Sequence, residues 1–135
     1  MGTWGTGPFE NDSAADFSNH LDDLDAESRI TAIHETLSVA AGENGYLETD
    51  SAASAVAAAA VVVAQLPGGR PVSAAYGPEL RIPPIPLELR ALAMKALDRV
   101  VAEDSELADL WADTADARQW RERIAELRRP LEGVP

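Results

Sequence analysis

Apolar residues recur every three or four positions along most of the chain, which is the spacing of one face of an α-helix. The clearest such stripe comprises Leu89, Leu92, Ala93, Ala96, Leu97 and Val100. We find no useful stretch of the strict apolar–polar alternation that marks a half-buried β-strand. The pattern therefore predicts an all-α fold of five to six helices.

The first two predicted helices have recognisable beginnings. Good N-cap residues for the first helix are Asn11, Asp12 and Ser13. Asp16 follows Ser13 at the spacing of a capping box, with Asp in place of Glu. The apolar face of this helix comprises Phe17, Leu21 and Leu24, so we expect it to end near Leu24. Asp25 is then placed to cap a second helix, whose apolar stripe comprises Ile30, Ile33, Leu37 and Ala41.

The segment AASAVAAAAVVVAQL, from Ala52 to Leu66, is apolar on every side. It is too short to cross a bilayer, which takes about 20 apolar residues. A helix that is apolar all round is buried all round. We therefore predict that this Ala/Val-rich helix, capped by Thr49 or Asp50, lies at the centre of the bundle.

One long irregular segment, about residues 67–86, separates this helix from the next. It contains many prolines, which fix φ and keep the preceding residue out of the α region. Loops of this length often carry function. Its RIPPIP sequence suits either a polyproline ligand or internal packing, and we favour packing.

The C-terminal part holds two apolar stripes that are out of phase. Asp104 or Ser105 is placed to start a helix with Leu107, Leu110 and Trp111. The later stripe comprises Trp120, Ile124, Leu127 and Leu131. The nine residues from Trp111 to Trp120, at about 100° each, leave the stripes roughly half a turn apart. We therefore expect a kink, a break or a turn within residues 112–117.

Composition limits the kind of protein. The 135 residues suit one domain spanning residues 1–135. Eleven basic and 23 acidic residues give a formal net charge of −12, which suits solubility or a basic partner and opposes binding to nucleic acid or an anionic membrane. The absence of cysteine excludes disulfides and thiolate chemistry. The start has no basic region followed by an apolar one, so we expect a cytoplasmic location.

One cluster could hold a metal. Asp12, Asp16 and His20 follow one another at steps of four along one helical side, and His34 could approach them from the next helix. The Glu-x-x-His motif of di-iron bundles is missing, so a cap, a surface acid and a partly exposed histidine explain these residues better. No nucleophile elbow or phosphate-binding loop occurs. We therefore expect no cofactor and favour a protein that is not an enzyme.

The opening, MGTWGTGPFENDSAADF, is rich in turn and aromatic residues. It resembles the opening of the bacterial domain of unknown function 4259 family, whose members begin much like M-G-x-W-G-x-G-x-F-x-N-D-x-A-x-D. The resemblance continues in GYLE (residues 45–48), in the alanine-rich helix and in ALDRVVAEDSELADLW. Family members look to carry a glutamate in the alanine-rich helix, where this chain has Ala60. The resemblance implies no particular activity.

The opening segment has two interpretations. Trp4 and Phe9 can anchor the terminus by burial, with glycines letting the backbone lie close to the helices. Alternatively the segment forms a small binding site, for which the candidate residues are Trp4, Gly5, Gly7, Phe9, Asn11, Asp12 and Asp16.

Three functional hypotheses remain. The leading one is a small, acidic, non-enzymatic protein that binds a protein partner, and an immunity-like or inhibitor role against a basic partner is one form of it. The alternative is a metal- or small-ligand-binding helical bundle with enzymatic activity that uses Asp12, Asp16, His20 and His34. A self-associating structural protein is the third, and the sequence leaves the oligomeric state open.

Overall fold

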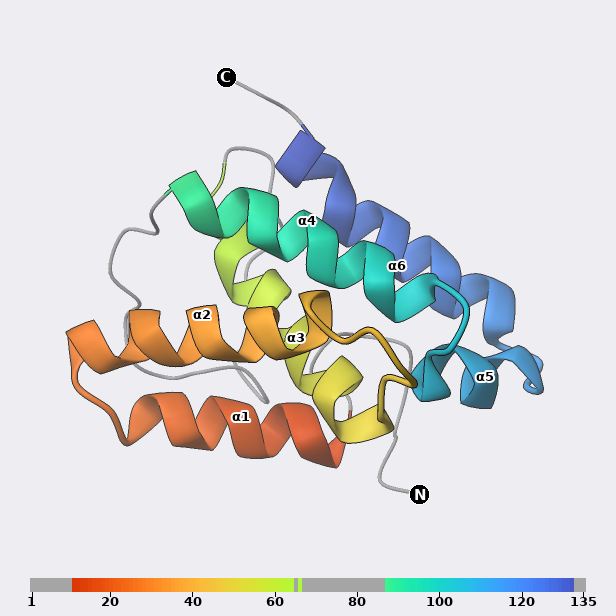
Figure 1. Cartoon of the computed structure of the whole chain (residues 1–135), viewed down its shortest axis with the longest axis horizontal. Coiled ribbons are helices and arrows are strands. Elements are labelled where there is room, and N and C mark those ends of the chain that lie inside the picture. The colour runs from red at the N-terminus through yellow and green to blue at the C-terminus, as the bar shows by residue number, and fades with distance from the viewer. Residues whose placement is uncertain (1–10, 65, 67–86, 133–135) are drawn as a thin grey trace.

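The computed structural model describes residues 11–64, 66 and 87–132, and these residues form six helices (Figure 1). The helices are α1 (Asp12–Asp22), α2 (Ala26–Ala41), α3 (Thr49–Ala64), α4 (Leu87–Val101), α5 (Glu106–Ala112) and α6 (Ala117–Glu132). No β-strand occurs among the described residues, so the predicted all-α class is confirmed. The proposed N-terminal anchor and most of the proline-rich segment lie outside the described residues.

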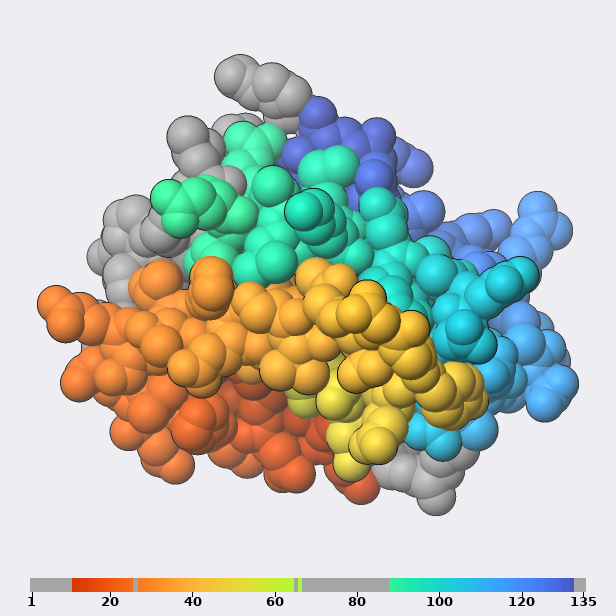
Figure 2. Space-filling view, in the orientation of Figure 1, coloured from red at the N-terminus to blue at the C-terminus, as the bar shows by residue number. Residues whose placement is uncertain are grey.

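Helix α3 is the centre of the bundle. It packs against all five of the other helices. Its residues from Ala52 to Val63 are buried, apart from the partly exposed Ser54. Figure 2 shows α1, α2 and α4 covering this face of the molecule, with little of α3 reaching the surface. Alanine side chains let neighbouring backbones approach closely, and the prediction of a buried Ala/Val helix is confirmed.

The remaining helices are arranged around α3. Helix α2 packs on α3 and α4, while α1 packs mainly on α3. Helix α6 runs back along α4 in the opposite direction (Figure 1). Arg128 on α6 links the surfaces of this pair, because its guanidinium donates to both carboxylate oxygens of Asp98 on α4, at 2.7 and 3.1 Å. Within the described part of the chain, no helix is long and apolar enough to cross a membrane.

The N-terminus of α1 differs from one prediction. Asn11 is the N-cap, and its side-chain oxygen accepts a hydrogen bond from the Ala14 N–H at 2.8 Å. Ser13 therefore lies inside the helix, and the capping box with Asp16 was wrong. The Ser13 hydroxyl instead donates to the Asp50 carboxylate at the start of α3, at 2.9 Å. The helix ends at Asp22, two residues before the predicted Leu24.

Two other predicted caps are confirmed and one is wrong. Asp25 accepts from the Ser28 N–H at 2.8 Å and caps α2. Ser105 accepts from the Ala108 N–H at 3.4 Å and caps α5. Thr49 and Asp50, however, already lie within α3. A residue from another helix takes over the role that they were expected to fill, as described below.

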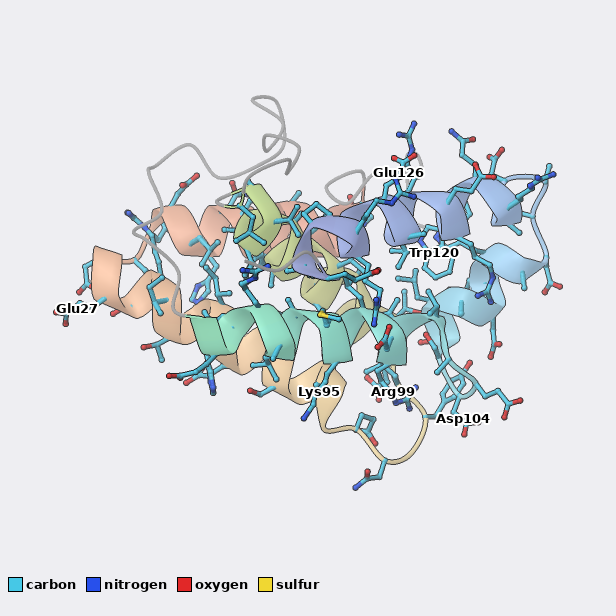
Figure 3. All side chains as sticks on the ribbon, turned by 90° about the horizontal axis from the view of Figure 1, so that it is seen from above. Glu27, Lys95, Arg99, Asp104, Trp120 and Glu126 are labelled. Atoms are coloured by element: carbon cyan, nitrogen blue, oxygen red, sulfur yellow. The ribbon has the colours of Figure 1, made fainter. Side chains whose placement is uncertain are left out.

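The break between the last two helices is a turn at residues 113–116, as the phase of the apolar stripes predicted. The turn redirects the chain so that the two stripes meet. The rings of Trp111 and Trp120 stack with their centres 6.2 Å apart and an angle of 11° between their planes. Figure 3 shows Trp120 on the inner side of α6. Trp120 is buried, so the stack closes the end of the core at α5.

Candidate functional site

Two segments far apart in the sequence meet at one end of the bundle. The first, residues 42–50, connects α2 to α3, and the second, residues 102–113, connects α4 to α5 and includes α5 (Figure 1). We call these two segments the loop junction. At its centre, Leu47 and Ser105 form a parallel bridge, in which Leu47 N–H donates to Asp104 O at 2.7 Å and Glu106 N–H donates to Leu47 O at 2.8 Å. Both bridge residues are buried.

Arg99, in the last turn of α4, holds the two segments together. Its guanidinium donates to the backbone carbonyls of Glu43 at 3.0 Å, of Glu103 at 3.1 Å and of Asp104 at 3.2 Å. It also donates to the carbonyl of Gly45. Arginine suits this role because its rigid planar fork presents several donors at once. Figure 3 shows Arg99 and Asp104 on the same edge of the molecule.

Asp104 adopts an uncommon backbone conformation that serves the junction. Its φ angle of 62° lies in the left-handed region, which Asp tolerates better than most residues because its short side chain bonds locally. In this conformation its carbonyl accepts from both Leu47 and Arg99. The Asp104 carbonyl therefore links its own segment to Leu47 in the other segment and to Arg99 in α4.

Side chains of α5 complete the junction. The Glu106 carboxylate accepts from the Thr49 N–H at 2.8 Å, and so satisfies a backbone donor in the first turn of α3. This hydrogen bond holds the pKa of the Glu106 carboxyl below its ordinary value. The Tyr46 hydroxyl donates to the Asp109 carboxylate at 3.0 Å. The pKa of Tyr46 is raised mainly by partial desolvation of its hydroxyl and, to a smaller extent, by the hydrogen bond to Asp109.

The surface of the loop junction combines apolar and acidic groups. Among the described residues only three large apolar side chains are exposed, and two of them, Tyr46 at 51% and Leu110 at 39%, belong to the junction. The junction carries no lysine or arginine. It carries eight carboxylates, namely Glu43, Glu48, Asp50, Glu103, Asp104, Glu106, Asp109 and Asp113.

The structure describes only part of the predicted N-terminal site. Trp4, Gly5, Gly7 and Phe9 lie outside the described residues. Asn11 caps α1, whereas Asp12 and Asp16 are exposed on that helix. A structural role for Asn11 is therefore established, and binding by this segment stays a prediction.

The metal-binding alternative gains no support from the described residues, which include all four of its side chains. Asp12, Asp16, His20 and His34 are each exposed. Helices α1 and α2 pack mainly on other helices rather than on each other. No group of three or more His, Asp or Glu side chains in the described part of the chain is placed to hold a metal ion.

Sequence reasoning did not anticipate the loop junction. GYLE and ALDRVVAEDSELADLW stood out only as segments with a family resemblance, and local patterns gave no sign that they would meet. The sequence held one weak sign that Arg99 has a special place beside the junction. Arg99 is the last basic residue before a run of acidic residues that reaches Asp116.

The model of one protein family, described as Domain of unknown function (DUF4259), matches residues 2–123. Because this match covers most of the chain, the chain belongs to that family. Both segments of the loop junction fall within the matched residues. We found no match to the chain among curated proteins or among solved structures.

Proposed function

We propose that this member of the DUF4259 family is a small, non-enzymatic binding protein of the bacterial cytoplasm whose partner is a basic protein. An inhibitor or an immunity protein is one form that such a role takes. The observation that carries the proposal is the formal net charge of −12, together with the eight carboxylates of the two loop-junction segments, whose own residues include no lysine or arginine. A field of this sign attracts basic proteins and speeds their association.

The hydrogen bonds of the loop junction also support a binding role. Arg99, the Leu47–Ser105 bridge and the Glu106–Thr49 contact hold both connections in a fixed conformation. A surface that is ordered before it binds loses less conformational entropy when the partner arrives. The loop junction is therefore prepared for contact without first having to fold.

The proposal is tested by affinity capture from a lysate of the native host. The protein is immobilised, bound proteins are eluted with rising salt, and an unrelated protein of similar negative charge serves as the control. We expect one basic protein to be retained in a defined stoichiometry and to elute later from this protein than from the control. Retention no stronger than that of the control would count against the proposal.

Native mass spectrometry of protein purified without a chelator separates this proposal from the metal-binding alternative. A metal or small-molecule adduct that disappears in Asp16→Ala or His20→Ala would favour the alternative. The mass of the protein with a second polypeptide would favour protein binding, and the mass of the protein alone would count against the metal-binding alternative.

A further inference from the structure

We propose that the basic partner docks on the loop junction, with Tyr46 and Leu110 as the apolar anchors of the interface. This inference rests on the proposed function and adds the surface and the chemistry of the partner segment. The occupant is a segment of a basic protein in which an apolar side chain is flanked by arginine or lysine.

The two anchors belong to one surface because three contacts bring residues 46–49 alongside α5. These contacts are the Leu47–Ser105 bridge, the Thr49–Glu106 hydrogen bond and the Tyr46–Asp109 hydrogen bond. Leu110 follows Asp109 directly in α5 and lies one helical turn after Glu106. Tyr46 and Leu110 therefore lie beside the same three contacts between residues 46–49 and the α5 segment.

The exposure of both side chains favours an interface. Their neighbours Leu47 and Leu107 are buried, so the core does take up apolar side chains from these segments. Aromatic side chains with a polar tip, such as tyrosine, are enriched in interfaces, because they bury a large rigid area and still bond at one end. The Tyr46 ring is ordered by its bond to Asp109 before any partner arrives.

Charge decides which occupant fits. A partner arginine can stack on the Tyr46 ring while its guanidinium pairs with Asp109 or a neighbouring carboxylate. A second copy of this acidic chain, in contrast, would bring its own junction carboxylates towards the same region. The complementary occupant is therefore cationic, with an apolar residue for Leu110.

Helix α1 is the strongest rival surface, because it and the following turn are also acidic. The carboxylates there are Asp12, Asp16, Asp22, Asp23 and Asp25. No large apolar side chain of α1 is exposed, since Phe17 and Leu21 are both buried. The combination of apolar anchors with carboxylates therefore favours the loop junction over α1.

The test uses the full chain and a synthetic peptide in which arginine alternates with leucine. Control peptides replace leucine with glycine, or arginine with glutamate. Binding is followed residue by residue by NMR and quantified by calorimetry. We expect shifts of backbone amides at residues 43–50 and 103–113, with the leucine-containing basic peptide binding more tightly than either control.

Matched variants then examine the anchors with the peptide and with any captured partner. Tyr46→Ala and Leu110→Ala are each expected to weaken binding about tenfold or more, as interface anchors do. Val39→Ala is the control, because Val39, which is 56% exposed on α2, is the third exposed large apolar side chain of the described residues. Tyr46→Phe keeps the ring and is expected to retain most of the affinity.

Several outcomes would overturn the inference. Amide shifts centred on α1, equal binding of the glycine peptide, or unchanged affinity in both anchor variants would each exclude this surface. A dimer in sedimentation that Tyr46→Ala dissociates would assign the surface to a second copy. If a captured basic partner binds the anchor variants normally, the proposed function stands and only the surface is wrong. If no basic protein or peptide binds at all, the proposed function fails as well.

Discussion

Replacing Arg99 with alanine tests whether one side chain holds the loop junction together. The change removes four hydrogen bonds to carbonyls. Two of the acceptors, Glu43 and Gly45, lie in the first segment of the junction, residues 42–50, at 56 and 54 positions from Arg99 along the chain. The other two acceptors, Glu103 and Asp104, are local.

The size of the effect follows from the exposure of these bonds. A hydrogen bond from a charged donor contributes roughly 1.5–3 kcal/mol, but partly exposed carbonyls regain water when the donor is lost. We therefore assign about 1 kcal/mol to each of the two bonds that cross the junction and about 0.5 kcal/mol to the local pair together. Arg99→Ala should lower the free energy of unfolding by roughly 2–3 kcal/mol, or Tm by about 8–12 °C.

Arg118→Ala is the matched control, because it removes the same residue type and the same charge. Arg118 pairs with Glu122 at 3.3 Å, but their side chains are 93% and 61% exposed. Such a pair within one helix contributes about 0.3–0.5 kcal/mol. Arg99→Lys keeps the charge but loses the planar fork, and should recover less than half of the loss.

Urea unfolding followed by circular dichroism measures the three free energies. Hydrogen exchange supplies a local measurement, since the Leu47 amide, which bonds to Asp104 at 2.7 Å, should lose protection in Arg99→Ala. The reasoning is refuted if Arg99→Ala destabilises the protein no more than Arg118→Ala, or if the Leu47 amide exchanges as in the parent protein.

Three further predictions address the junction, the core and the caps. Asp104 has a positive φ of 62°, so Asp104→Gly should be within about 1 kcal/mol of the parent, while Asp104→Val should cost about 2 kcal/mol in calorimetry. Ala58 is fully buried in α3, so Ala58→Leu should cost about 1–3 kcal/mol in urea unfolding, whereas Ala91→Leu at an exposed position of α4 should change little. Hydrogen bonds to backbone N–H groups hold the pKa values of the Asp25 and Glu106 carboxyls below their ordinary 3.8 and 4.5. Their stabilisation is therefore present above those ordinary values and is lost as pH falls through the lowered ones. Tm should fall less steeply between about pH 5 and pH 2 in Asp25→Asn and Glu106→Gln, which keep an acceptor oxygen, and equal slopes would exclude this cause.

Local rules account for the parts of the fold that could be predicted from the sequence. Asp25 and Ser105 cap helices because each accepts a bond from a backbone N–H three residues later, which a short stretch of sequence reveals. The burial of α3 was predictable for a similar reason, since a helix without a polar face has no side to turn to water.

The Ser13 capping box failed for a local reason, because Asn11 caps α1, whereas the incorrect cap of α3 and the missing predictions depend on tertiary packing. Thr49 looked like a cap for α3, but its own N–H donates to Glu106, 57 positions away. The stack of Trp111 on Trp120 required a turn whose direction the phase of two stripes does not specify. The exposure of Tyr46 could not be anticipated, because a lone tyrosine between glycine and leucine is compatible with either burial or exposure.

The sequence by itself therefore determined the helical class, the buried alanine-rich helix, the acidic net charge and three candidate caps that the structure confirms, Asn11, Asp25 and Ser105. These properties depend on periodicity, local hydrogen bonding and composition. The tertiary structure alone decided that residues 42–50 lie against residues 102–113, with Arg99 between them and Tyr46 and Leu110 at the surface. The packing of α2 and α4 around α3 brings the ends of these helices together, and hydrogen bonds across that distance form only once the packing exists.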